Sequence, residues 1–208
     1  MNSAKYLIFL LLGLCAHSVN AQNYVFSNDI PVRGSSQPLK MSWAGGLNAP
    51  QFNEIDLDND GLLDLAVFDR VGPRLLTFRN GGTASTIDFT FAPEYALQFP
   101  AVLKDWVLLR DFDNDGYIDL FTAVPQVSNV RVYRNTSALT GGTLSFALFK
   151  DTLISVYPPT LAMYVGKSDI PAIDDIDGDG DLDILTFGVG GQKIEWHKNL
   201  SVENTGGL

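Results

Sequence analysis

One nine-residue pattern occurs three times in this chain, and it constrains the fold more than any other feature. The copies begin at Asp56, Asp111 and Asp175, and each follows D-x-D-x-D-G-x-x-D without gaps. A stretch in which apolar residues alternate follows each copy, as in Leu65-Ala-Val67-Phe. Self-similarity of this kind indicates a repeat architecture built from one supersecondary unit.

A second landmark repeats in phase with the acidic loop. Twenty-four residues after each first Asp stands an Asn, preceded by a base and, just upstream, an aromatic residue. The three landmarks are Phe78-Arg79-Asn80, Tyr133-Arg134-Asn135 and Trp196-His197-Lys198-Asn199. We interpret each as a turn, because Asn tolerates the left-handed conformation, with its aromatic ring packed between sheets.

The pattern around each loop predicts four short strands per repeat. One strand leads into the loop, a second leaves it, a third ends at the basic residue and Asn, and a fourth carries alternating apolar residues such as Phe89-Thr-Phe91. Four antiparallel strands form a propeller blade. We therefore expect an all-β protein made of about three β-propeller blades, an incomplete propeller or the N-terminal part of a longer one. The chain after the first 21 residues shows no sustained 3.6-residue apolar period, so its pattern does not predict helices.

The first residues have the features of a secretory signal peptide. Lys5 precedes the apolar run Tyr6–Leu14, which is too short to span a bilayer, and small residues follow at Val19-Asn20-Ala21. Cleavage before Gln22 would remove Cys15, the single cysteine, so the exported chain would contain no disulfide. We expect a secreted or cell-surface protein, extracellular or periplasmic.

The repeat starts divide the remainder of the chain. We expect a signal peptide at 1–21, an N-terminal strand in 22–47 that could close a last blade, a first blade at 48–100, a second at 101–164, and a third at 165–208 without its outer strand.

The acidity of the chain is concentrated in the loops. The formal net charge is −10, from 24 Asp and Glu against 14 Lys and Arg, and twelve of those carboxylates stand at the fixed Asp positions of the three loops. An acidic chain disfavours nucleic acid, which requires clustered Lys and Arg. No apolar run after residue 21 reaches membrane length, so we expect no membrane span in the mature chain.

The loop chemistry points to a hard cation. Asp side chains at positions 1, 3 and 5 converge when the chain curls tightly, and Gly at position 6 permits the turn; oxygen ligands in this arrangement suit Ca²⁺ better than Mg²⁺. An EF-hand would need Glu at position 12, but that position is Val67, Thr122 or Thr186. Simple Asp-rich turns would not need four carboxylates, which repel one another unless a cation neutralises them.

The triplicated loop resembles the FG-GAP/VCBS repeat of integrin α-subunit propellers and secreted bacterial proteins, over about residues 48–208. The resemblance implies one Ca²⁺ per repeat, bound by side chains at positions 1, 3, 5 and 9 and by the carbonyl at position 7. The implied ligands are Asp56, Asp58, Asp60, Asp64 and the carbonyl of Leu62; Asp111, Asp113, Asp115, Asp119 and the carbonyl of Tyr117; and Asp175, Asp177, Asp179, Asp183 and the carbonyl of Asp181.

The resemblance also implies an extracellular binding or adhesion module whose partner is a protein or a glycan. The alternative is an accessory propeller of a secreted polysaccharide-degrading lyase or hydrolase. We expect no catalytic activity, because His197 is the single histidine after the signal peptide and no cysteine remains. Carboxylates outside the loops show no spacing typical of an acid/base pair; they include Asp69, Asp88, Glu94 and Asp105.

Overall fold

The structure, a computed structural model, describes residues 27, 30–83, 86, 88–156 and 159–206. The expected signal peptide (1–21) lies outside these residues, and so do residues 22–26, 28 and 29 of the segment expected to contain an N-terminal strand (22–47). The chain divides into two units, Met1–Pro31 and Val32–Leu208, and the description below concerns the second.

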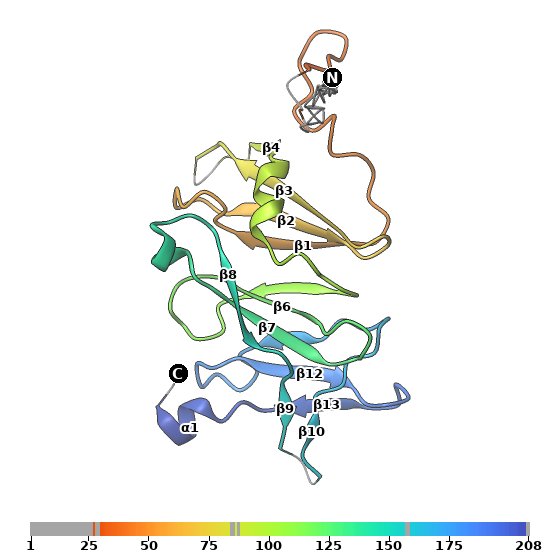
Figure 1. Cartoon of the computed structure of the whole chain (residues 1–208), viewed down its shortest axis with the longest axis vertical. Coiled ribbons are helices and arrows are strands. Elements are labelled where there is room, and N and C mark those ends of the chain that lie inside the picture. The colour runs from red at the N-terminus through yellow and green to blue at the C-terminus, as the bar shows by residue number, and fades with distance from the viewer. Residues whose placement is uncertain (1–26, 28–29, 84–85, 87, 157–158, 207–208) are drawn as a thin grey trace, which may run out of the picture. The chain divides into compact units, whose positions relative to one another are not determined.

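Three antiparallel sheets follow one another along this unit (Figure 1). The first has the order β1-β2-β3-β4, with β1 Pro50–Ile55, β2 Asp64–Asp69, β3 Arg74–Asn80 and β4 Phe89–Phe91. The second repeats this order with β5 Val107–Arg110, β6 Asp119–Ala123, β7 Val130–Asn135 and β8 Phe146–Lys150. The third consists of β11 Ala172–Asp174, β12 Asp183–Phe187 and β13 Ile194–His197.

Smaller elements connect or flank the sheets. Strands β9 (Ile154–Ser155) and β10 (Leu161–Ala162) form a separate hairpin. The helical elements are the 3₁₀ turns η1 (Pro93–Gln98) and η2 (Ser137–Thr140) and the five-residue helix α1 (Ser201–Thr205). None of the helices in the described ranges is long and apolar enough to cross a membrane.

The expected fold class is confirmed, because the unit is mostly β and consists of small antiparallel sheets with the strand order of propeller blades. Alternate side chains of a strand point to opposite faces, and β1 shows this alternation with two polar residues on its buried face. In β1, Phe52 and Glu54 face solvent, whereas Gln51, Asn53 and Ile55 are buried.

The first strands of the three sheets lie next to one another, with β5 contacting both β1 and β11. Polar side chains join them. The side-chain amide of Asn53 donates to the carbonyl of Val107 (3.3 Å) and accepts the N–H of Leu109 (3.1 Å), while Gln51 accepts the N–H of Val107 (3.0 Å). The side chains of β1 thus pair with the backbone of β5 where no strand ladder exists.

Two apolar clusters fill the spaces between the sheets. One joins the first and second sheets through buried side chains that include Phe68, Leu109 and Leu120. The other joins the second and third through Trp106, Phe121 and Ile184. Burial on both faces makes the second sheet the centre of the core.

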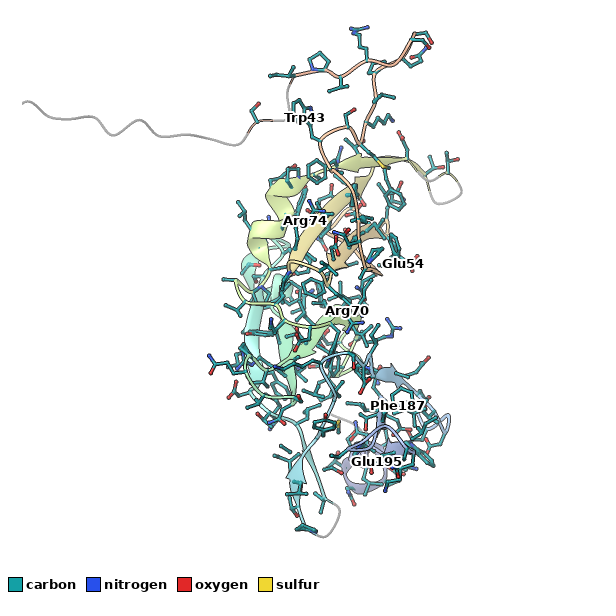
Figure 2. The ribbon with its side chains drawn as sticks, turned by 90° about the vertical axis from the view of Figure 1, so that its right-hand side faces the viewer. Trp43, Glu54, Arg70, Arg74, Phe187 and Glu195 are labelled. Atoms are coloured by element: carbon teal, nitrogen blue, oxygen red, sulfur yellow. The ribbon has the colours of Figure 1, made fainter. Side chains whose placement is uncertain are left out.

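Two arginines also tie the repeats together. Arg70, labelled in Figure 2, donates to the carbonyl of Asp105 (2.6 Å) in the second repeat and to the carbonyl of Lys167 (2.9 Å), which precedes β11 in the third. Arg110 donates to the carbonyl of Ile173 (3.2 Å) on β11. These bonds join the first repeat to the second and third, and the second repeat to the third.

Candidate metal centres

Each acidic loop connects the first strand of its sheet to the second, β1 to β2, β5 to β6 and β11 to β12. The backbone curls through the left-handed region at two positions of every loop. Position 4 has a positive φ in Asn59 (60°), Asn114 (56°) and Gly178 (78°). Position 6 has a larger one in Gly61 (85°), Gly116 (87°) and Gly180 (98°), where a side chain would be strained.

The carboxylate at position 1 holds this curl in place. Asp56 accepts the N–H groups of Asp60 (3.2 Å) and Gly61 (2.9 Å). Asp111 and Asp175 accept the equivalent N–H groups in their own loops at 2.9 to 3.2 Å. The carboxylate at position 5 in turn accepts the N–H of position 7 in every copy.

The curl brings three carboxylates of every loop together, each offering an oxygen within 4.8 Å of the others. The groups are Asp56, Asp58 and Asp64; Asp111, Asp113 and Asp115; and Asp175, Asp177 and Asp179. Asp60, Asp119 and Asp183, the remaining carboxylates of the pattern, are not part of these groups. Neighbouring loops also touch, because the side chain of Asn114 donates to the carbonyl of Gly180 (2.8 Å).

The carboxylate at position 9 is fully buried in every copy and ties the loop to the end of the third strand. Asp64 accepts the N–H of Leu57 (2.8 Å) with one oxygen and the N–H of Asn80 (2.6 Å) with the other. Asp119 accepts the backbone N–H groups of Phe112 (2.9 Å) and Asn135 (2.6 Å) in the same way.

The third copy differs at this position. Asp183 accepts the N–H of Asn199 (2.7 Å) with Oδ1, and its Oδ2 has no hydrogen-bond partner among the described residues.

The electrostatics of these loops favour neutralisation by a cation. Burial raises the pKa of Asp119 to about 6, against the lowering effect of its two N–H donors, and the charges of Asp115 and Asp111 raise it further. Burial likewise raises the pKa of Asp64, with added repulsion from Asp58 and Asp56. A divalent cation would remove both the repulsion and part of the desolvation penalty.

The base that precedes each landmark Asn forms an ion pair with the carboxylate at position 3 of its own loop. Arg79 contacts Oδ2 of Asp58 at 3.2 Å, Arg134 contacts Oδ2 of Asp113, and Lys198 contacts Oδ2 of Asp177. Sequence reasoning missed this pair. The signal was available, since the base stands at the same offset from the loop in all three copies and has the opposite charge.

In the first and second loops, the ion pair leaves the other oxygen at position 3 without a hydrogen bond from a described residue. Oδ1 of Asp58 and Oδ1 of Asp113 are buried and lack a hydrogen bond within the described ranges. A buried carboxylate oxygen without a partner is unfavourable unless a bound cation compensates for its lost hydration. The base therefore neutralises one side of this carboxylate and leaves the other for a ligand.

The interpretation of the Asn turn was wrong in one respect. Asn80, Asn135 and Asn199 are not among the residues with positive φ. Instead, the side chain of Asn80 donates to the carbonyl of Leu63 (3.2 Å) and accepts the N–H of Asp88 (3.0 Å). The side chain of Asn135 likewise donates to a backbone carbonyl and accepts a backbone N–H. Asn is required here as a simultaneous donor and acceptor, rather than for its backbone freedom.

The aromatic residues before the Asn also differ from expectation. Phe78 is buried and Tyr133 packs against the first core cluster. Trp196, however, is 50% exposed, so its ring is not enclosed between two sheets.

His197 has structural partners on two sides. Its ring nitrogens lie 3.1 Å from Oγ1 of Thr186 and 2.9 Å from Oγ of Ser155, which belongs to the β9–β10 hairpin. Burial lowers the pKa of His197, although the nearby Glu195 (Figure 2) opposes this effect. Its interactions join the third sheet to the hairpin.

The fold and loops define a β-propeller-type repeat module. Residues 111–186 match the family model described as the FG-GAP-like repeat, which confirms the resemblance for the segment from the second loop to β12. No curated protein and no solved structure matches the chain.

The residues present fit the cation that such repeats often bind. Each loop supplies oxygen ligands alone, with three carboxylates close together and, in each, at least one buried oxygen that no hydrogen bond satisfies. Carboxylates at positions 1, 3 and 5 or 9 would hold the ion, and Leu62, Tyr117 and Asp181 occupy the position from which a carbonyl would complete the shell.

Proposed function

We propose that this protein is a secreted, non-catalytic repeat module that binds one Ca²⁺ in each acidic loop and uses its blades to bind a protein or glycan outside the cell. The observation that supports calcium most directly is the buried, unbonded oxygen at position 3 of the first two loops, opposite the oxygen that the base contacts.

The proposed role of calcium is to stabilise the fold. The loops join strands whose sheets are small, and the exported chain would lack cysteine, so no disulfide could stabilise it. A cation in each loop would fasten the first strand of a sheet to the second. Because the same ion would neutralise Asp64 or Asp119 next to the third strand, its binding would be linked to folding.

The proposed partner role rests on the kind of module rather than on a particular site. Repeats of this kind present exposed faces on rigid sheets, and fold alone does not identify what they bind. The absence of a catalytic role is supported by His197, whose two ring nitrogens are engaged by Thr186 and Ser155.

Ion counting on loop variants tests the calcium proposal. Calcium bound to the full chain is measured by isothermal titration and by elemental analysis after equilibrium dialysis. The variants Asp58→Ala, Asp113→Ala and Asp177→Ala are each expected to bind one ion fewer than the wild type, because each removes a carboxylate from one group. Asp88→Ala is the matched control, since Asp88 lies outside the loops and pairs with Lys40. Loop variants that bind as many ions as the control would refute the proposal.

Export and partner binding need separate measurements. Mass spectrometry of protein from the culture medium or periplasm is expected to find Gln22 at the N-terminus. A glycan array and an extracellular-matrix protein panel, probed with and without calcium, test the binding role. Signal on neither panel, under conditions in which calcium is bound, would contradict it.

A further inference from the structure

The short helix after the third sheet lies against the third acidic loop, through a contact that the described residues of the other two repeats do not make. Asp181, at position 7 of that loop, accepts the Ser201 hydroxyl (2.8 Å) and the N–H of Val202 (3.0 Å) with its Oδ2. Both donors lie in the first turn of α1. The contact places the next residue, Glu203, beside the loop.

The result is a second group of carboxylates. Asp179, Asp181 and Glu203 each offer an oxygen within 4.8 Å of the others, and Asp179 also belongs to the group within the loop. The first and second repeats have Leu62 and Tyr117 at position 7, so they cannot form an equivalent group.

The state of Asp181 provides an independent sign of a ligand. This side chain is 4% exposed, yet its Oδ1 has no hydrogen-bond partner in the described part of the chain. Oδ2 of Asp179 is also buried without a hydrogen bond. Ionised carboxylates are rarely buried unless they are paired or coordinate a metal ion.

One lysine is too little charge to balance this region. The Lys198 ammonium lies 2.5 Å from Oε1 of Glu203 and 3.5 Å from Oδ2 of Asp179, and it also contacts Asp177. It is shared among three carboxylates, and none of its contacts reaches Asp181.

Comparison with the other repeats gives the size of the imbalance. If each loop holds one divalent cation, as proposed above, then four Asp and one Arg leave the first and second loops with a net charge of −1 each. The third has five Asp, Glu203 and Lys198, which leaves −3. One more divalent cation would return the third loop to the −1 of the other two.

We propose that Asp179, Asp181 and Glu203 form a second site for a hard divalent cation, adjacent to the third loop and sharing Asp179 with it. All three side chains offer oxygen ligands, which suit Ca²⁺. The bound ion fastens α1 to the third loop. The charge comparison rests on the proposed calcium in the loops, whereas the burial of Asp181 does not.

The test is the number of calcium ions bound by the full chain, measured by titration and elemental analysis. The wild type is expected to bind four, and Glu203→Gln is expected to bind three, because the substitution removes the one carboxylate that α1 supplies. Glu94→Gln removes the same charge from an exposed position on η1 and is expected to bind four. Thermal melts confirm that both variants fold.

The possible results separate this inference from the proposed function. A wild type that binds three ions overturns the second site and leaves the loop sites intact, and a wild type that binds none overturns both. Four ions in both the wild type and Glu203→Gln place the fourth elsewhere and overturn the site. A wild type with three and a Lys198→Gln variant with four would show that the lysine itself fills the position, which also overturns it.

Discussion

The backbone N–H of Asn80 donates to Oδ1 of Asp64 at 2.6 Å, which joins the last position of the acidic loop to the end of the third strand. The same bond occurs between Asn135 and Asp119 (2.6 Å) and between Asn199 and Asp183 (2.7 Å). Each loop is therefore braced against a strand that lies more than a dozen residues further along the chain. In the first loop this carboxylate also belongs to the group that could hold a metal ion.

Removing the carboxylate at position 9 of a loop is expected to destabilise the blade even without calcium. Asp119→Ala leaves the buried N–H groups of Phe112 and Asn135 without an acceptor, which costs about 3 kcal/mol of unfolding free energy at roughly 1–3 kcal/mol per group. Urea unfolding in the presence of chelator measures the loss. Asp88→Ala breaks an exposed ion pair with Lys40 and should cost below about 1 kcal/mol. Equal losses in the two variants would show that the bracing is not structural.

The basic residue beside each loop is expected to position the carboxylate that would bind the ion. Arg134 contacts Oδ2 of Asp113, and Oδ1 of that residue is the buried oxygen left for the ion. Arg134→Met should therefore weaken calcium binding at this loop about tenfold, the lower end of the effect of losing a residue that orients a metal ligand. Arg134→Lys should retain most of the affinity, because Lys198 makes the equivalent contact in the third repeat. Tighter binding by Arg134→Met would identify the base as a competitor of the cation.

The amide of Asn53 is expected to hold the first two repeats together. Asn53→Ala removes the donor to the carbonyl of Val107 and the acceptor for the N–H of Leu109, both buried, and should cost about 2–3 kcal/mol in chemical unfolding. Glu54→Ala, on the exposed face of the same strand (Figure 2), should stay within about 0.5 kcal/mol of the wild type. A loss no larger for Asn53→Ala than for Glu54→Ala would mean that the apolar cluster alone joins the sheets.

The burial of His197 predicts a pH-dependent contribution to stability. Because its pKa is lowered in the folded state, the unfolded chain binds the proton more readily, and stability falls as the pH drops below the ordinary value of 6.5 towards the folded pKa. Above that window the contribution is fully present. Unfolding free energies measured across it should therefore decrease more steeply with acid for the wild type than for His197→Gln. Parallel pH curves would show that His197 titrates alike in both states.

The loops and blades could be predicted from the sequence because their signals are local. Four Asp at fixed offsets and alternating apolar residues specify a curled loop between two strands without knowledge of the rest of the fold. The pairing of Arg79 with Asp58 depends instead on how β3 folds back beside the loop, a contact between residues 21 positions apart.

Features unique to the third repeat were harder to predict. Helix α1 is five residues long and shows no periodicity, so its contact with Asp181 appears only in the folded chain. The exposure of Trp196 also depends on its neighbours, since the third sheet has three strands in the described part where the first two have four. Secondary-structure propensities and sequence motifs cannot predict such differences between copies of one repeat.

Calcium in the acidic loops is proposed to stabilise the blades, and a thermal melt of the full chain with excess Ca²⁺ or with chelator tests this role most directly. Each ion at a concentration about 100 times its dissociation constant would add about 2.7 kcal/mol, and each kcal/mol raises the midpoint by about 2–4 °C in a domain of this size. We predict a midpoint many degrees higher with Ca²⁺, and a smaller rise with Mg²⁺. The same midpoint with calcium and with chelator would contradict the account.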